Sequence, residues 1–207
     1  MATLNPPGRI RVGTVGPPIP DTEVKLAEDG EIMVRGPQVM KGYRNMSEKT
    51  AEALGDDGWL MTGDVGEFDE AGYLRIVDRK KELIINAAGK NMSPANIEAK
   101  LKAASGLIAQ AVAIGDARPY NVALIALDPE SLAARGASAD DPAIGEEIAR
   151  AVEAANARLS RVEQIKRYEI VSGEWLPGGD ELTPTMKLKR RPIADKYADE
   201  IEALYAR

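Results

Sequence analysis

Hydrophobic and polar residues alternate over short runs in the first part of the chain, and glycine or proline separates these runs. The run TEVKLA places Val24 and Leu26 on one face of a strand, and GEIMVRG places Ile32 and Val34 in the same way. A period of two is typical of half-buried strands. The pattern therefore predicts a small unit of short strands joined by tight turns.

Serine marks the start of two predicted helices. Ser47 precedes a run with helical propensity and is the expected N-cap of a short helix at 47–54. Ser93 is followed by Pro94, and a cap followed by proline is typical of the first turn of a helix. We expect a longer helix to begin at this second serine.

The pattern from residue 78 onward mixes helices and strands. A hydrophobic run that turns through Asn86 to Gly89 predicts a hairpin. Hydrophobic residues at helical spacing predict one helix at 142–159 and a final helix at 193–205. Further strands are predicted at 107–116, 121–128 and 164–171. These elements together predict a compact α+β domain of about 130 residues.

Composition limits the available chemistry. The 207 residues include no cysteine and no histidine, which excludes disulfides, thiolate nucleophiles and an imidazole base. The net charge of −6 opposes general binding to nucleic acid. No hydrophobic run has the length of a bilayer-spanning helix or the form of a secretory signal, so we expect no transmembrane segment and a cytoplasmic protein.

Carboxylate and guanidinium groups are the first candidates for ligand binding. In MTGDVG, Gly63 and Gly66 permit sharp turns that leave the Asp64 carboxylate able to accept two hydroxyls, as in the ribose contact of dinucleotide folds. The alternative is an aspartate that lies in a turn and accepts hydrogen bonds from its own backbone. Asp78 and Arg79 stand where the composition changes, a position suited to a hinge, with a surface salt bridge as the alternative.

Two later segments could also contact a ligand. Small residues surround Gly89 and Lys90 in the loop 85–93, so the backbone could approach a narrow pantetheine arm, although an ordinary hairpin loop fits equally well. In TPTMKLKRR, alternation points Lys187 and Lys189 the same way, and one ammonium could stabilise charge on an α-phosphate. A solvated basic strip and a nucleic-acid patch are the alternatives.

These motifs resemble, in order and over nearly the whole chain, the acyl-adenylate-forming superfamily. VGTVGPPIPDTEVKLAEDGEIMVRGPQVMKGY resembles the small barrel that closes the large amino-terminal domain, and WLMTGD resembles its ribose-binding turn. DRKKELI resembles the hinge, and TPTMKLKRR resembles the catalytic lysine segment of the mobile carboxyl-terminal domain. Within the superfamily, KRYEIVSGEWLPGGDELTPTMKLKRR and KYADEIEALY are most similar to long-chain acyl-CoA synthetases.

The resemblance implies an α+β fold in two parts. Residues 1–77 would form an incomplete, small β-barrel-like subdomain of the large domain. Residues 78–207 would form the mobile carboxyl-terminal domain, a three-stranded sheet with flanking helices plus a hairpin. Asp78 would be the hinge between them.

The resemblance also implies a role for each candidate side chain. Asp64 and Arg79 would bind the ribose, and Lys187 would contact the acyl-adenylate during adenylation. The loop around Gly89 and Lys90 would be carried into the thioester-forming site. In this loop the residues after the hinge lack the lysine that some relatives have, which leaves the CoA contacts undefined.

In this superfamily a carboxylate attacks the α-phosphate of Mg-ATP, and CoA thiol then attacks the acyl-AMP after the small domain rotates. The resemblance therefore implies an AMP-forming long-chain acyl-CoA ligase that uses a fatty acid or other carboxylate, ATP, CoA and Mg²⁺. The phosphate loop, the metal ligands and the acyl tunnel would lie upstream of Met1, so we expect a carboxyl-terminal fragment, inactive alone, with no metal ligands of its own. Peripheral membrane association of the parent is compatible with this expectation.

Two other classes of protein remain as competing hypotheses at this point. A stand-alone module could use the ribose turn to bind AMP or an acyl-adenylate without catalysis. An interaction domain could instead dock on a separate large subunit.

Overall fold

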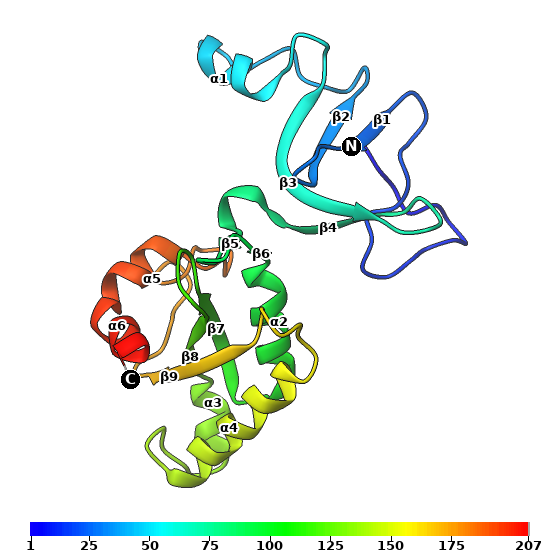
Figure 1. The fold of residues 1–207 in the computed structure, drawn as a ribbon. Coiled ribbons are helices and arrows are strands. Elements are labelled where there is room, and N and C mark those ends of the chain that lie inside the picture. The colour runs from blue at the N-terminus through cyan, green and yellow to red at the C-terminus, as the bar shows by residue number, and fades with distance from the viewer. Residues whose placement is uncertain (207) are drawn as a thin grey trace. The chain divides into compact units, whose positions relative to one another are not determined.

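The structure is a computed structural model that describes residues 1–206 (Figure 1). The chain divides into two compact units, Met1–Leu83 and Ile84–Arg207. Among the described residues, the first unit contains one cluster of buried hydrophobic side chains and the second unit contains two. In the described part of the chain, no helix combines the length and the hydrophobicity needed to cross a membrane.

The first unit contains a four-stranded antiparallel sheet in the order β1-β2-β3-β4. Its strands are β1 (Glu23–Leu26), β2 (Glu31–Arg35), β3 (Leu60–Phe68) and β4 (Leu74–Arg79). The predicted alternation holds, because Val24 pairs with Val34 and Leu26 pairs with Ile32 across the first two strands. Ile32, Val34 and Leu74 form the centre of the core of this unit.

The sheet continues past β4 into the amino-terminal segment and curls. The Val15 N–H donates to the carbonyl of Leu74 at 2.8 Å, and the Leu74 N–H donates to the carbonyl of Gly16 at 3.1 Å. Because the same segment leads into β1, these bonds bring the two edges of the sheet toward each other. The curled sheet confirms the predicted β-barrel-like subdomain.

The helix of the first unit, α1 (Ser47–Ala53), lies where it was predicted, but its cap differs. Met46 occupies the N-cap position and no side chain caps the helix, so the assignment of Ser47 as the cap was wrong. The hydroxyl of Thr50 bonds the preceding loop instead, donating to the Met46 carbonyl at 2.8 Å and accepting from the Tyr43 N–H at 2.9 Å. This hydroxyl connects the helix to the loop before it.

A three-stranded sheet in the order β7-β8-β9 forms the centre of the second unit. β7 (Ile108–Ile114) and β8 (Asn121–Leu127) are antiparallel, and β9 (Ile165–Val171) is parallel to β8. A parallel neighbour requires a crossover, which here contains α3 (Pro129–Ala134) and α4 (Pro142–Asn156). The predicted three-stranded sheet is confirmed, whereas α3 was not predicted.

Helices cover both faces of this sheet, and a short hairpin precedes it (Figure 1). The hairpin pairs β5 (Ile84–Ile85) with β6 (Asn91–Met92). α2 (Pro94–Ala104) starts as predicted, with the Ser93 hydroxyl accepting the Asn96 N–H at 3.0 Å. α2 and α4 pack against one face of the sheet through residues such as Ala123 and Ile125, and the carboxyl-terminal helices pack against the other face through Leu124.

The predicted final helix is divided into α5 (Arg190–Lys196) and α6 (Ala198–Ala206). Tyr197 interrupts it, with φ −106° and ψ 29°. Tyr205 attaches α6 to the sheet, because its hydroxyl lies 3.0 Å from the Ile114 carbonyl and 3.1 Å from the Tyr120 carbonyl. Burial raises the pKa of Tyr205 to about 12.

This pKa predicts a specific loss of stability at alkaline pH. The unfolded chain releases the tyrosine proton near pH ~10, whereas the folded chain keeps it until about pH 12. The contribution of Tyr205 to stability is therefore complete below the unfolded pKa and is lost as pH rises through the folded pKa. In denaturant titrations across this range, we expect the free energy of unfolding to fall more steeply for the unaltered protein than for Tyr205→Phe. Equal slopes would disprove the assignment to Tyr205.

Candidate functional site

An irregularity in β3 presents the Asp64 side chain. The register between β2 and β3 shifts at this point, and Gly63 has φ +73°, in the left-handed region that favours glycine. The Thr62 hydroxyl donates to the Ile32 carbonyl at 2.8 Å and accepts the Asp64 N–H at 3.1 Å. These bonds hold the backbone of the aspartate in one conformation.

Asp64 and Arg79, which the sequence predicts to bind one ribose, face each other across β3 and β4. They are direct cross-strand partners, and the Arg79 Nε lies 2.9 Å from the Asp64 Oδ1. The aspartate side chain is 32 % exposed and the arginine side chain is 63 % exposed. A carboxylate acceptor and guanidinium donors therefore stand together at an open surface, and this set of groups suits a vicinal diol beside a phosphate.

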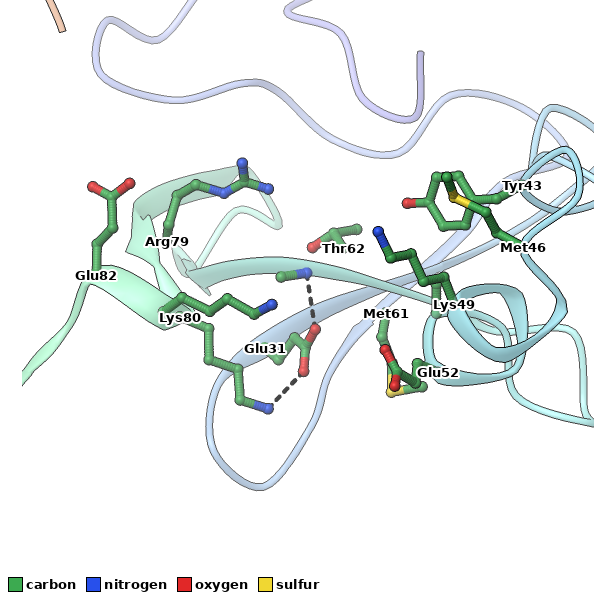
Figure 2. Close-up of a pocket in the computed structure, with 13 residues that line it drawn as sticks. Glu31, Tyr43, Met46, Lys49, Glu52, Met61, Thr62, Arg79, Lys80 and Glu82 are labelled. Carbon is green, nitrogen blue, oxygen red and sulfur yellow. Dashed lines mark hydrogen bonds and ion pairs between the residues drawn. The ribbon is translucent and has the colours of Figure 1, made fainter. Parts of the chain in front are cut away.

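Glu31 supports this pair, and the sequence contained no local signal for it. Its buried carboxylate accepts the Gly63 N–H at 2.8 Å and binds the Lys80 ammonium at 2.8 Å (Figure 2). The pKa of Lys80 is raised, because its ammonium also bonds Asp29 at 2.6 Å. Glu31 thus connects Gly63, the residue before Asp64, with Lys80, the residue after Arg79, and its partners lie too far along the chain for a motif to reveal them.

A cleft of about 810 Å³ borders Arg79 in the first unit. Figure 2 shows Arg79, Lys80 and Glu82 on one side, with Tyr43, Met46 and Lys49 toward α1. The remaining lining residues are Glu31, Glu52, Ala53, Met61, Thr62, Gly63 and Lys81. More than half of the lining side chains are charged, and Asp64 is not among them.

Asp78 lies within β4 and not in a loop. It pairs with Val65, is 8 % exposed, and its carboxylate accepts the Arg79 N–H at 2.7 Å. The compact units divide a few residues later, after Leu83 and the short 3-10 helix η1 (Lys80–Glu82). The pivot at Asp78 and the domain limits 1–77 and 78–207 stay predictions.

The loop of residues 86–90 at the tip of the β5–β6 hairpin is exposed and tightly bonded within itself. The Asn86 Oδ1 accepts the N–H groups of Ala88 at 3.0 Å and Lys90 at 2.9 Å, and the Asn86 carbonyl accepts the Gly89 N–H at 2.8 Å. Gly89 has φ +73°, and a Cβ there would meet no atom within 4 Å. The backbone conformation, and not crowding, therefore requires glycine at this position, and its surface remains open to a ligand.

Lys187 stands at the end of a tight turn in the second unit. The Thr183 N–H donates to the Lys187 carbonyl at 2.8 Å, and the Lys187 N–H donates to the Thr183 hydroxyl at 3.0 Å. The Lys187 side chain is exposed, whereas the Lys189 ammonium donates to the Gly179 carbonyl at 2.8 Å. The fold therefore separates the two lysines that alternation had placed together, and Lys187 is the one available to a ligand.

A partly buried ion pair fixes the segment that follows this turn. Both carboxylate oxygens of Glu98, in α2, accept from the guanidinium of Arg190, at 2.6 and 2.9 Å. Glu98 is 5 % exposed and also accepts the Ala113 N–H at 3.0 Å. Leu182, on the other side of the turn, is fully buried. The lysine thus projects from a loop that is anchored at both ends.

Curated relatives are similar over the whole length of the chain. The fatty-acid--CoA ligase fadD11 of Mycobacterium tuberculosis is 58 % identical over 216 residues, an alignment that covers 100 % of this chain and 38 % of the relative. The long-chain-fatty-acid--CoA ligase FadD15 of the same organism is 44 % identical, with 95 % of this chain and 34 % of the relative covered. The chain thus spans little more than a third of the length of these relatives.

A solved structure shares the fold. An ATP-bound RpMatB-BxBclM chimera superposes with a TM-score of 0.70 at 31 % sequence identity, covering 96 % of this chain and 39 % of the chimera. The family model for the AMP-binding enzyme C-terminal domain matches residues 81–207, which is more than half of the chain. On this match, the protein belongs to the family of AMP-binding enzymes that carry this C-terminal domain.

Proposed function

We propose that this chain supplies the carboxyl-terminal part of an ATP-dependent, AMP-forming long-chain fatty acyl-CoA ligase. The observation that carries the proposal is the contact between Asp64 and Arg79 at an exposed edge of the first unit. The family match and the names of the two mycobacterial relatives support it. In this proposal the complete ligase converts a fatty acid, ATP and CoA to acyl-CoA, AMP and pyrophosphate.

Asp64 and Arg79 would hold the ribose of the nucleotide. The carboxylate accepts hydrogen bonds from the two ribose hydroxyls, and the guanidinium can donate to a ribose oxygen or to the α-phosphate. Because the Arg79 Nε already binds one carboxylate oxygen, the carboxylate is oriented before the nucleotide arrives. An oriented acceptor loses less freedom on binding, which favours affinity.

Lys187 would act in the first half-reaction and the hairpin loop in the second. The ammonium of Lys187 would stabilise negative charge on the α-phosphate and the attacking carboxylate. After rotation about Asp78, the loop with Gly89 and Lys90 would line the path of the CoA thiol. The exposure of Lys187 and of the loop supports both roles, since each must be accessible to a ligand.

Mg²⁺ would neutralise phosphate charge in the complete ligase, but residues 1–206 do not fit a resident metal, because they include no group of three or more acidic side chains placed to hold one. The cytoplasmic location and a peripheral membrane association of the parent stay predictions.

The ribose assignment predicts the effect of Asp64→Asn in the complete ligase. The amide keeps the shape of the side chain but weakens two charge-assisted hydrogen bonds, each worth ~1.5–3 kcal/mol. We expect the Km for ATP and the inhibition constant for AMP to rise roughly 10- to 100-fold, with little change in thermal stability because the ion pair with Arg79 is exposed. Steady-state kinetics and AMP inhibition measure both constants.

Asp69→Asn is the matched control for this experiment. Asp69 is 31 % exposed and also pairs with an arginine, Arg11, at 2.7 Å in the same unit. We expect Asp69→Asn to leave the Km for ATP and the inhibition constant for AMP unchanged. Equal weakening in the two variants would refute the ribose assignment. Micromolar AMP binding by the 207-residue chain alone would instead favour the stand-alone binding module.

A further inference from the structure

We propose that the carboxyl-terminal helix α6 positions the loop of residues 86–90 through the turn between β7 and β8, with Arg118 as the positioning residue. The turn comprises residues 115–120. The catalytic consequence rests on the proposed function, in which this loop serves the thioester-forming step. The mechanical part of the proposal is that α6 holds the turn and the turn holds the loop. It depends only on contacts within the second unit.

The loop's internal hydrogen bonds set its local conformation, but the two short strands of the hairpin do not fix its position. β5 and β6 contain two residues each, and isolated two-stranded hairpins are marginally stable in water. Its outer edge is bonded to the turn instead. The Ile85 N–H donates to the Asp116 Oδ1 at 3.0 Å, the Ala117 N–H donates to the Ile85 carbonyl at 2.8 Å, and the Ala87 N–H donates to the Arg118 carbonyl at 3.0 Å. The turn therefore determines where the loop lies.

The turn itself is held in an unfavourable conformation. Ala117 has φ +55°, in the left-handed region, and a non-glycine residue there persists only where its surroundings hold it. Ala117 and Arg118 make two of the three bonds to the hairpin. A change in the support of the turn would therefore be transmitted to the loop.

α6 supplies that support. Arg118 forms an ion pair with Glu202, and its guanidinium lies 4.6 Å from the centre of the Tyr205 ring. The Tyr205 hydroxyl contacts the backbone at both ends of the turn, at Ile114 and Tyr120. The last turn of α6 is also attached to β9, since the Arg167 guanidinium donates to the Leu204 carbonyl at 2.8 Å. The helix end thus contacts the same turn that is bonded to the hairpin.

Amide hydrogen exchange on the 207-residue chain tests the mechanical part. In Arg118→Gln, we expect the amides of Ala87 and Ala117 to exchange roughly tenfold faster, because both donate in the bonds between the turn and the hairpin, and the turn has lost its ion pair and its ring contact. The amide of Ile148, in the core of α4, should keep its rate. Unchanged exchange at Ala87 and Ala117 would overturn the inference, and so would an equal increase at Ile148, which would indicate global destabilisation.

Arg135→Gln is the matched control, because Arg135 forms an ion pair with Glu147 at 2.6 Å in the same unit. It should leave the Ala87 and Ala117 amides unchanged. Glu202→Gln removes the same ion pair as Arg118→Gln from the side of α6, so it should reproduce the faster exchange with a smaller amplitude. If Arg118→Gln fails to fold, Glu202→Gln decides the question alone.

Half-reactions of the complete ligase test the catalytic part. We expect Arg118→Gln to raise the Km for CoA and to slow conversion of supplied acyl-AMP roughly tenfold, with unchanged acyl-AMP formation, and Arg118→Lys to recover part of the loss. Faster exchange at Ala87 without any effect on the CoA step would overturn the catalytic part alone. If Asp64→Asn also leaves the nucleotide constants unchanged, the proposed function fails while the exchange result still stands.

Discussion

Lys187→Ala should slow acyl-AMP formation by roughly 10²- to 10³-fold in the complete ligase and leave conversion of supplied acyl-AMP to acyl-CoA nearly unchanged. The ammonium is the group proposed to face the charge that develops on the α-phosphate, and loss of one preorganised electrostatic contact has about this effect. The Lys187 side chain is exposed, and its loop is anchored by Leu182 on one side and Arg190 on the other. Removal of the side chain should therefore not unfold the protein. Pyrophosphate release and thioester formation, measured separately, distinguish the two half-reactions.

Lys189→Ala provides the comparison for this prediction. Lys189 has the same chemistry two positions away, but its ammonium is bonded to the Gly179 carbonyl. We expect it to lower thermal stability slightly and to affect both half-reactions equally. A large selective loss of adenylation in Lys189→Ala, or equal loss of both half-reactions in Lys187→Ala, would be incompatible with the assignment.

Asp78→Pro should have the opposite selectivity and slow thioester formation roughly 100-fold, since a misplaced reacting group can cost this much. Proline fixes φ near −65° and so restricts rotation about the proposed pivot. Because Asp78 is paired with Val65 in β4, the same substitution also removes a backbone donor from a strand. The effect on rotation must therefore be separated from the damage to the sheet.

Ile76→Pro is the control for damage to the sheet. Ile76 lies in the same strand, pairs with Gly66 of the same partner strand and is 48 % exposed. Both proline variants should lose stability, but only Asp78→Pro should favour the first half-reaction over the second. Asp78→Ala removes the carboxylate without restricting the backbone. If the thioester step is retained in Asp78→Pro, or lost equally in Ile76→Pro, the pivot lies elsewhere.

Much of the secondary structure follows from local pattern. The alternation of Val24 and Leu26 or of Ile32 and Val34 was enough to predict β1 and β2, because each strand has one buried face. Ser93 and Pro94 were enough to predict the start of α2, since capping involves neighbours along the chain. Ser47 also indicated a cap, but the helix begins at Ser47 itself, and Met46 occupies the N-cap position.

The connections that depend on distant contacts were not predictable in this way. α3 does have a start signal, since Asp128 caps it and Pro129 stands in its first turn, but its six residues are too few to show a periodic hydrophobic face. The final helix continues its hydrophobic spacing through Tyr197, and the sequence does not reveal the interruption there. Tyr197 is buried and accepts a hydrogen bond from the Trp175 indole at 3.1 Å, so tertiary packing accompanies the break.

For this protein, residue types and their order alone established which chemistry is available, where most of the strands and helices lie, and which superfamily the motifs resemble. The fold decided which of these residues meet. Asp64 and Arg79 lie on separate strands, and Glu31 bonds both the glycine before Asp64 and the lysine after Arg79. Lys187 and Lys189 differ in that the ammonium of Lys189 donates to a backbone carbonyl. Which residues meet depends on side chains that are distant in sequence. No local periodicity predicts these contacts, because only chain folding brings the atoms within hydrogen-bonding distance.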